Sequence, residues 1–515
     1  MNNRAEKLKE FQDSNHIFDL VVVGGGITGA AIARDASYRG LNVLLCEKDD
    51  FAEGTSSKSS KLIHGGVRYL EHGEFDLVRE STLERALLWK NAPEYVRPLK
   101  FLFPCYKDTR VPLWKLNLGL WLYDILALFK TPSLHKKYNA HQTHKLVPPL
   151  LNKDLKGSIF YWDGITDDAL LTVANIYDAQ KNGATCFNKC LVHDVSPKND
   201  KNIVTVSLED RMSGQNFKIK TKNISICVGP WADKVLKDFK IPYRKILAPS
   251  RGSHIMVSQD KLPLDHAIAL FHPKDKRVMF AIPWLNCSVI GTTDIFTDQL
   301  PEKNIITGKE ISYLLEASNH FFPEHQLNPS DVISTWAGVR PLVMEEGKSE
   351  SELSRDHLID WLDPFNAVLI VGGKFTTHRE MAEQAVDRVI SESQKRNRPL
   401  MNKFKVSPTK NLRLPAMHLE EGLKKTLIIK TKTNEIYAEQ IDFILGLESV
   451  NTLEDFMVRR TNLYYNEACN GLSFIDKLKP FFTKILKWKE SDWVENIDSY
   501  KNFIDTQITN PRKNI

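Results

Sequence analysis

Residues 18–47 read FDLVVVGGGITGAAIARDASYRGLNVLLCE, and the rest of the chain is organised around what this stretch binds. The apolar run over residues 20–23 is typical of a buried strand, and the glycines after it lead into small helix formers over residues 30–39. Gly40 ends that helix, and residues 41–46 form a second apolar run. The pattern predicts a strand, a tight turn, a helix and a second strand.

The spacing Gly24-x-Gly26-x-x-Gly29 matches the dinucleotide-binding turn. The first glycine permits the turn, the second lets backbone approach a pyrophosphate, and the third lets the helix pack on the strand. The helix start presents N–H groups and a positive dipole to the phosphates. Glu47, about 20 residues further on, favours an adenosine ribose without a 2′-phosphate. A glycine-rich turn of another α/β protein is the alternative, and at this point NAD and FAD both fit.

The composition indicates a multidomain globular protein. A chain of 515 residues is too long to fold around a single hydrophobic core, so about two to three domains are expected. The 42% hydrophobic and 26% charged residues exclude wholesale disorder. The net charge of +6 suits an anionic substrate or membrane surface, although a solvated basic face is the commoner cause. Seven scattered cysteines without a CxxC pair predict buried thiols in a reducing compartment and no metal site.

A second motif, GTSSKSSKLIHGGVRYLE at residues 54–71, directly follows the predicted ribose-binding strand. Its hydroxyl donors, lysines and glycines suit a loop beside phosphates and a planar ring, whereas in isolation it would be a flexible serine-rich loop. Together with the glycine turn and several later blocks, this motif resembles the FAD-dependent glycerol-3-phosphate dehydrogenases of the aerobic bacterial type. The resemblance covers roughly residues 18–379 and extends weakly to the C-terminal region.

The resemblance implies an α/β fold in three parts. These are a Rossmann-like FAD-binding domain, a mainly antiparallel β substrate (cap) domain and a C-terminal helical domain. The expected boundaries are 17–85, 155–240 and 355–397 for the discontinuous FAD-binding domain, 86–154 and 241–354 for the substrate/cap region, and 405–515 for the helical domain. Local patterns add a hairpin around Ser213-Gly214 and a helix over residues 170–182, capped by Asp167 or Asp168.

The flavin end is expected at residues 372–377, between a last apolar strand and an amphipathic helix capped by Thr376 or Thr377. A helix N-terminus there would stabilise negative charge on the reduced ring. This turn and the embedded loop make FAD preferable to NAD. The expected FAD-binding residues are Gly24, Gly26, Ile27, Thr28, Gly29, Glu47, Thr55, Ser56, Ser57, Ser60, Lys61, Leu62, His64, Gly229, Gly373, Lys374, Phe375 and Thr376.

Flavin-dependent oxidation of an alcohol needs a hydride acceptor, a proton acceptor and cations for any anionic tail. Arg68, Arg340 and Lys374 are the expected phosphate ligands, because arginine can chelate two oxygens. Tyr69 and Thr377 are the expected hydroxyl donors of the substrate site.

The expected catalytic residues are His254, Arg340 and Lys374. His254 is the expected base, because its block matches the family's active-site strand, whereas an isolated histidine is more often structural. Arg340 matches the family's substrate arginine, although a buried arginine can simply pair with a carboxylate. Arg355 is a further candidate.

The resemblance implies oxidation of sn-glycerol 3-phosphate to dihydroxyacetone phosphate, with electrons passed through FAD to a membrane quinone. An oxidase that uses oxygen shares the same motifs. Rivals from other classes are an amine or amino-acid oxidase of the same fold, an RNA-binding flavoprotein and a non-catalytic flavin-bound scaffold. Outside the linker and C-terminal helices the sequence has no concentrated basic patch, so no nucleic-acid partner is expected.

Residues 111–130 are apolar, carry tryptophans and are flanked by lysines, but are too short to span a bilayer. An interfacial helix and a buried core helix both explain this pattern. The lysine-rich segment 477–489 is better explained as a solvated basic helix. Since residues 1–16 show no secretory signal, the expected location is the cytoplasm, at the inner face of the cytoplasmic membrane. Whether the chain forms a homodimer is left open.

Overall fold

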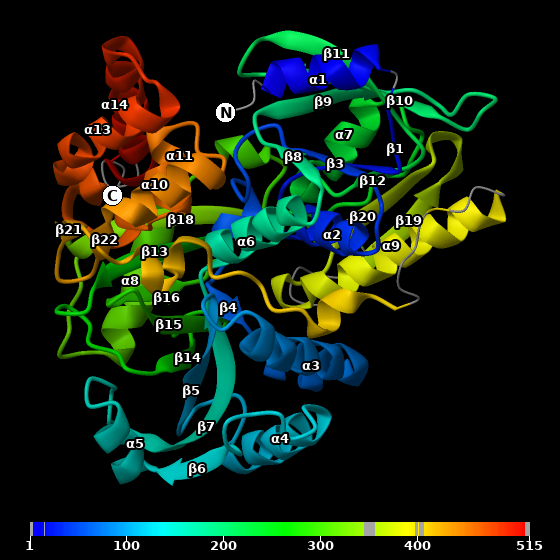
Figure 1. Cartoon of the computed structure of the whole chain (residues 1–515). Helices are drawn as coiled ribbons and strands as arrows, with labels where there is room; N and C mark the ends of the chain where they lie inside the picture. Colours follow the sequence, from blue (N-terminus) through cyan, green and yellow to red (C-terminus); the bar gives the residue numbers. More distant parts are fainter. Residues whose placement is uncertain (1–3, 15, 345–355, 397–399, 401–405, 510–515) are drawn as a thin grey trace.

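The computed structural model describes residues 4–14, 16–344, 356–396, 400 and 406–509 (Figure 1). Its central six-stranded sheet has the order β19-β20-β12-β2-β3-β8. All neighbouring strands are parallel except β19, which is antiparallel to β20 at the edge. The strands are β2 (Leu20–Val23), β3 (Val43–Cys46), β8 (Thr185–Phe187), β12 (Ile224–Ile226), β19 (His357–Leu362) and β20 (Ala367–Gly372).

Both faces of this sheet are covered, which explains why β2 is apolar throughout. Successive strand side chains point to opposite faces. Leu20 and Val22 pack with the helices α2 (Ile27–Tyr38), α6 (Asp168–Lys181) and α9 (His378–Lys395). Val21 and Val23 pack against a second, four-stranded sheet. The predicted strand, glycine turn, helix and second strand are therefore confirmed.

The four-stranded sheet has the order β1-β11-β10-β9. Its antiparallel pair β10 and β11 confirms the predicted hairpin, and Asp167 confirms the predicted cap of α6, because its side chain accepts a hydrogen bond from Leu170 N. The elements here are α1 (Arg4–Asp13), β1 (Ile17–Phe18), β9 (Cys190–Val195), β10 (Val204–Asp210), β11 (Gln215–Thr221) and α7 (Ala232–Asp238).

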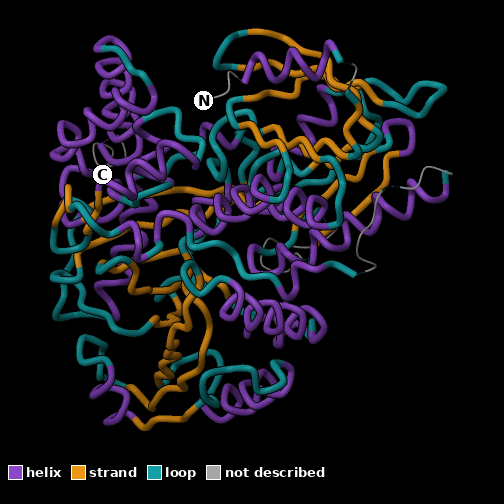
Figure 2. Tube along the Cα trace, in the orientation of Figure 1, coloured by secondary structure: helices purple, strands orange, loops and turns teal. Residues whose placement is uncertain are grey.

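A ten-stranded, mainly antiparallel sheet forms the other large layer (Figure 2). Its main path runs β17-β13-β16-β15-β14-β5-β7-β4, with β18 paired to β13 and β6 paired to β7. The strands are β4 (Leu62–Ile63), β5 (Val96–Tyr106), β6 (Lys136–Asn139), β7 (Leu155–Thr166), β13 (Ser250–Ser258), β14 (Ala267–Phe271), β15 (Val278–Trp284), β16 (Cys287–Gly291), β17 (Ile295–Phe296) and β18 (Val332–Arg340).

β7 lies in this sheet, although the sequence prediction assigned residues 155–166 to the FAD-binding segments. The physical reason is its long antiparallel ladder with β5, from Val96 opposite Thr166 to Tyr106 opposite Leu155. The partner strand β5 ends about fifty residues before β7 begins, so local sequence patterns cannot predict that the two strands pair. The helices around this sheet are α3 (Phe75–Asn91), α4 (Leu113–Leu126), α5 (Ala140–Leu146) and α8 (Gly308–Phe321).

The C-terminal region is mostly helical, as expected, with a short hairpin at its start. It lies beside β13 and β18, at the opposite end of the molecule from α4, β6 and α5 (Figure 1). Among the described residues, no helix is both long and apolar enough to cross a membrane. The elements are β21 (Leu427–Lys430), β22 (Glu435–Tyr437), α10 (Ala438–Leu447), α11 (Leu453–Arg459), α12 (Leu463–Asn466), α13 (Ile475–Leu486) and α14 (Glu490–Ile504).

The cysteines follow the expectation of buried thiols except at one position. Cys469 is exposed, whereas the other six thiols are buried. Cys469 lies in an irregular segment before α13 and has a positive φ of 51°.

Candidate active site

The glycine turn joins β2 to α2 with no room for side chains. Gly24 has a φ of +109°, and a Cβ there would lie 2.6 Å from the Cys227 carbonyl oxygen at the end of β12. A Cβ on Gly29 would lie 1.9 Å from the Gly24 carbonyl oxygen. Gly26 is the N-cap of α2 and makes no side-chain capping bond. Because the turn carries no side chains, a pyrophosphate can approach its backbone at the N-terminus of α2.

Two side chains meet the backbone of this turn. The Glu47 carboxylate accepts a hydrogen bond from Gly25 N at 2.6 Å, and the Ser56 hydroxyl accepts one from Ile27 N at 2.9 Å. Burial raises the pKa of Glu47 to about 7. N–H groups and a hydroxyl suit phosphate oxygens, and a carboxylate suits ribose hydroxyls. This donor and acceptor set fits the adenosine diphosphate half of FAD.

Lys61 is held by a buried ion pair. Its Nζ lies 2.6 Å from the Asp168 carboxylate and donates to the Ser57 carbonyl oxygen at 2.7 Å. The Asp168 carboxylate also accepts from Ser59 N and Oγ. These contacts give Lys61 a role in fixing the loop, in addition to the cofactor contact predicted for it.

His254 lies on β13 and is buried beneath the same loop. Its Nε2 lies 2.8 Å from Ser60 Oγ, and its ring stacks on Trp336 with centroids 5.1 Å apart. Burial, then the charges of Arg340 and Lys61, hold the pKa of His254 well below its ordinary 6.5. Its buried Nδ1 has no hydrogen-bond partner among the described residues.

Two of the three predicted phosphate ligands already have hydrogen-bond partners on the protein. Arg340, at the end of β18, lies 2.9 Å from the Asp294 carboxylate and donates to Thr292 Oγ1 at 2.9 Å. Lys374 donates to Ser81 Oγ and, at 3.2 Å, to the Leu77 carbonyl oxygen.

Arg68, the third predicted phosphate ligand, lies in a short helix over Val67–His72, preceded by the left-handed Gly66. Its guanidinium group makes no hydrogen bond or ion pair with the part of the chain that the structure describes. Next to it, the Tyr69 ring centroid lies 5.0 Å from Lys374 Nζ. A partly buried cation that no described residue engages suits an anionic ligand.

One cavity of about 1010 Å³ brings the flavin-end and substrate residues together. Thr376 Oγ1 bonds both the N–H and the carbonyl of His64, so the flavin turn and the loop meet at its wall. The predicted residues that line the cavity are Thr55, Ser60, Leu62, His64, Arg68, Tyr69, His254, Arg340, Gly373, Lys374, Phe375 and Thr376.

The other predicted residues are not among those that line the cavity. Thr377 is buried, and its hydroxyl donates to the Lys374 carbonyl oxygen. Gly229 starts a 3-10 helix three residues after the end of β12. Arg355 lies outside the described residues. The remaining members of this group are Gly24, Gly26, Ile27, Thr28, Gly29, Glu47, Ser56, Ser57 and Lys61.

A family model described as FAD dependent oxidoreductase matches residues 19–384. The chain is 39% identical over 385 residues to an aerobic glycerol-3-phosphate dehydrogenase of Staphylococcus haemolyticus, covering 75% of this chain and 69% of that protein. It is 32% identical to an aerobic glycerol-3-phosphate dehydrogenase of Staphylococcus aureus, covering 96% and 95% of the two chains. The chain belongs to the FAD-dependent glycerol-3-phosphate dehydrogenase family.

Solved structures agree with this assignment. The glycerol-3-phosphate dehydrogenase from Bacillus halodurans, complexed with FAD, has a TM-score of 0.75 at 26% identity and covers 98% of both chains. The L-alpha-glycerophosphate oxidase from Mycoplasma pneumoniae shares the fold, with a TM-score of 0.59 at 21% identity over 78% of this chain and 99% of that chain. The predicted family, fold class and cofactor are confirmed.

The apolar wall of the cavity was not predicted from the sequence. It is formed by pairs two residues apart on neighbouring strands, so that both members of a pair point to the same face. The available signal was the alternation of side chains between the two faces of each strand. This alternation predicts the apolar wall only when the pairing of β5, β14 and β15 is known. The pairs are Phe101 and Phe103, Ala269 and Phe271, and Val278 and Phe280.

Proposed function

We propose that this protein oxidises sn-glycerol 3-phosphate to dihydroxyacetone phosphate with FAD and passes the electrons to a membrane quinone. The observation that carries the proposal is the convergence of His254, Arg68, Arg340 and Lys374 on one cavity beside the flavin turn. The names of the relatives, aerobic glycerol-3-phosphate dehydrogenases, support the same substrate.

The two halves of FAD are proposed to lie at different ends of the site. Glu47, Ser56 and the α2 N-terminus hold the adenosine diphosphate half, for which their donors and acceptor are suited. The flavin half lies at the cavity, between His64 and the turn at residues 373–376. When bound, FAD supplies the hydride acceptor for the alcohol carbon.

His254 is proposed to take the proton of the substrate C2 hydroxyl. Its low pKa keeps the imidazole neutral near pH 7, so that a ring nitrogen lone pair can accept a proton. Ser60 lies 2.8 Å from Nε2, and both residues line the cavity, so this edge of the ring is where a bound alcohol would meet it. Stacking on Trp336 fixes the ring orientation.

The cations are proposed to hold the phosphate. Arg68 contributes a guanidinium group that no described residue engages, while Thr292 and Asp294 fix the direction of Arg340. Lys374 contributes the third cation, and Tyr69 beside it a hydroxyl. A carboxylate substrate of an amino-acid oxidase would leave part of this cluster without a ligand, so the cluster favours a phosphate ester.

Membrane attachment is proposed at α4. Trp114, Leu118, Trp121 and Ile125 recur at three- and four-residue spacing and are 67%, 64%, 45% and 52% exposed, which makes an apolar stripe along one face. Lys115 on α4, Lys130 just after it, and Lys136 and Lys137 on β6 are exposed and suit an anionic headgroup layer.

The opposite side of α4 supports quinone as the acceptor. Leu116 and Gly119 line the cavity, so an apolar quinone leaving the membrane at this helix would reach the flavin end.

The reaction is tested by adding glycerol 3-phosphate to the purified protein without oxygen. We expect a yellow protein whose flavin absorbance is bleached, and colourless protein or unbleached flavin would refute the proposal. Peroxide yield, measured against quinone reduction, distinguishes the dehydrogenase from the oxidase.

The membrane surface is tested with the double variant Trp114→Glu and Leu118→Glu, with Asn117→Asp on the same helix as the control. We expect only the double variant to leave the membrane fraction while its activity with a soluble dye is kept. If both remain on the membrane, α4 is not the attachment site. Light scattering of the released protein measures whether it is a monomer or a homodimer.

A further inference from the structure

The C-terminal helical region has no part in the function proposed so far, yet two of its arginines reach into the FAD-binding fold. Arg459 at the end of α11 and its neighbour Arg460 are both buried, with side chains 3% and 0% exposed. Both bind Asp50, which lies about 410 residues earlier in the chain and is itself fully buried.

The contacts to Asp50 are directional on both carboxylate oxygens. Arg459 Nε donates to Oδ2 at 2.6 Å, and Arg460 donates from Nη1 to Oδ2 at 3.0 Å and from Nη2 to Oδ1 at 2.9 Å. Asn188 adds a hydrogen bond to Oδ1 at 2.9 Å. Burial opposes ionisation of Asp50, but the Arg460 and Arg459 charges outweigh it and hold its pKa well below the ordinary value.

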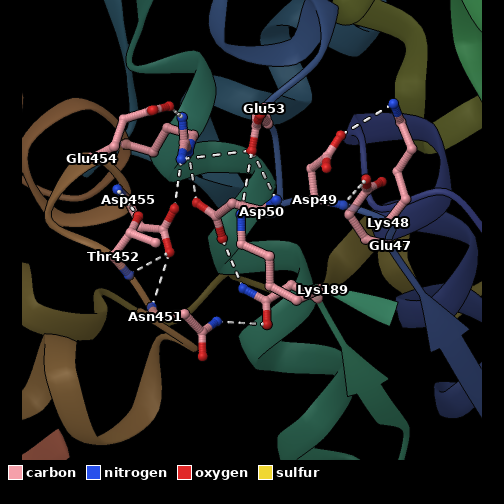
Figure 3. Close-up of polar contacts among 12 residues, drawn as sticks. Glu47, Lys48, Asp49, Asp50, Glu53, Lys189, Asn451, Thr452, Glu454 and Asp455 are labelled. Atoms are coloured by element: carbon pink, nitrogen blue, oxygen red, sulfur yellow. Dashed lines mark hydrogen bonds and ion pairs between the residues drawn. The ribbon is translucent and has the colours of Figure 1, made fainter. Parts of the chain in front are cut away.

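The arginines are in turn fixed from the C-terminal side. Arg459 also pairs with Glu454 at 2.8 Å and with Asp455 at 2.6 Å. Arg460 donates to the Glu448 carbonyl oxygen at 2.9 Å. Figure 3 shows these contacts, with Asp50 and Glu53 of the FAD-binding fold on one side and Glu454 and Asp455 of the C-terminal region on the other.

Asp50 belongs to a loop, residues 47–53, that wraps the glycine turn. Glu47 at its start bonds Gly25 N, and Ala52 near its end donates to the Gly25 carbonyl oxygen at 3.1 Å. Ala52 has a φ of 67°, a backbone conformation that an L residue adopts only when its surroundings enforce it. The centre of this loop is therefore tied to the C-terminal region, while both ends touch the turn.

We propose that Arg459 and Arg460 are positioning residues for FAD: by binding Asp50 they hold residues 47–53 against the glycine turn and keep Glu47 placed for the adenosine ribose. The proposal rests on the placement of the adenosine half of FAD at Glu47 under the proposed function. It assigns the C-terminal region a role in retaining the cofactor, through coupling of two sites that share one loop.

The test uses the full-length holoenzyme and the variant Asp50→Asn, which keeps the size of the side chain and removes the charge. FAD release is followed after dilution by the fluorescence of free flavin. We expect release about tenfold faster or more, a change typical of coupled sites. The visible spectrum of the bound flavin should be unchanged, because the flavin half lies at the other end of the site.

The matched control is Asp178→Asn. Asp178 is another buried aspartate, paired with Arg34 at 2.6 Å between α2 and α6, and it does not contact residues 47–53. The melting temperature of both variants is expected to fall, but only Asp50→Asn should release FAD faster than its loss of stability explains. Equal release rates at equal melting temperatures would overturn the proposal and leave Asp50 a purely structural residue.

Two arginine variants keep the test decisive if Asp50→Asn does not fold. Arg460→Lys keeps the charge but loses the two-point contact, and Arg460→Met loses both. FAD release should rise in the order wild type, Arg460→Lys, Arg460→Met, and wild-type release from Arg460→Lys would overturn the proposal.

Glu47→Ala separates this inference from the proposed FAD placement. If Glu47→Ala retains FAD like the wild type, the placement of the adenosine half is wrong. If Glu47→Ala loses FAD while Asp50→Asn does not, the role of the two arginines is wrong.

Discussion

The adenosine end and the flavin end of the proposed FAD site obtain their polar partners in different ways. At the adenosine end the partners are close in sequence, since Gly25 bonds Glu47 22 residues away and Ile27 bonds Ser56 29 residues away. At the flavin end the pair Ser60 and His254 is separated by 194 residues. The first end is a product of one supersecondary unit, and the second exists only after the cap sheet has formed against that unit.

This difference separates cofactor retention from chemistry. The glycine turn is dense, because added side-chain atoms would collide with backbone. The cavity is roomy, and its cations and base are carried by separate strands and turns. Changes at the adenosine end should therefore remove the flavin, whereas changes at the cavity should leave a yellow protein with altered kinetics.

The largest effect is expected from Gly29→Ala. The new Cβ would lie 1.9 Å from the Gly24 carbonyl oxygen, so α2 would have to move away from the turn that receives the pyrophosphate. We expect purified protein without flavin absorbance. Gly446→Ala is the matched control, because Gly446 also lies in a helix but has no atom within 4 Å of an added Cβ. A yellow Gly29→Ala protein would show that close packing at this turn is not required for FAD.

His254→Gln should leave the flavin bound and lower kcat about 10²- to 10⁴-fold, the usual contribution of a general base. KM for glycerol 3-phosphate should change little, because the phosphate ligands are intact. Stopped-flow bleaching of the flavin measures the step directly. The acid limb of the pH profile should lie well below pH 6.5, because burial and then Arg340 and Lys61 lower the His254 pKa.

His135→Asn serves as the control for His254→Gln. His135 is buried and paired with Asp124 at 2.8 Å, away from the lining of the cavity, so it represents a structural histidine. Its replacement should change stability and leave kcat nearly unaltered. If His254→Gln behaves in the same way, the proton acceptor is another group.

Arg340→Met should lower kcat/KM for glycerol 3-phosphate about 100-fold, equivalent to about 2.7 kcal/mol for a lost charged contact. With glycerol, which lacks the phosphate, the same variant should differ little from the wild type. Arg340→Lys should recover part of the loss, because it restores the charge without the two-point contact. An equal loss on both substrates would mean that Arg340 acts on the fold or the flavin and not on the phosphate.

These tests also measure what the sequence alone can predict. The glycine turn, the acid at Glu47 and the Asp167 cap follow from local spacing, because each pairs groups on adjoining elements. The cavity residues were identified through family resemblance. No local pattern shows that β13, β18 and the flavin turn meet.

The limits appear where partners are distant in sequence. Lys61 finds Asp168 107 residues away, and Arg460 finds Asp50 410 residues away. The sequence places Lys61 among serines beside a nucleotide site, and this pattern predicts a phosphate ligand. The ion pair with the buried Asp168 becomes visible only in the folded structure. The assignment of β7 to the FAD-binding segments was wrong for the same reason. Its place in the cap sheet depends on pairing with β5, which is distant in sequence.

The smallest effect concerns the pH dependence of Lys374. Burial lowers its pKa to about 8 from the ordinary 10.5, and only the protonated ammonium binds a phosphate. We expect kcat/KM for glycerol 3-phosphate, which reports the free enzyme, to fall about tenfold per pH unit above pH 8. Loss of stability caused by Lys374 cannot explain that fall. Between about pH 8 and 10.5 the unfolded chain binds more protons at this residue than the folded protein does. The contribution of Lys374 to the free energy of unfolding therefore rises with pH in this range. Lys374→Arg should move the alkaline limb beyond the measurable range, and an unmoved limb would assign it to another group at the cavity.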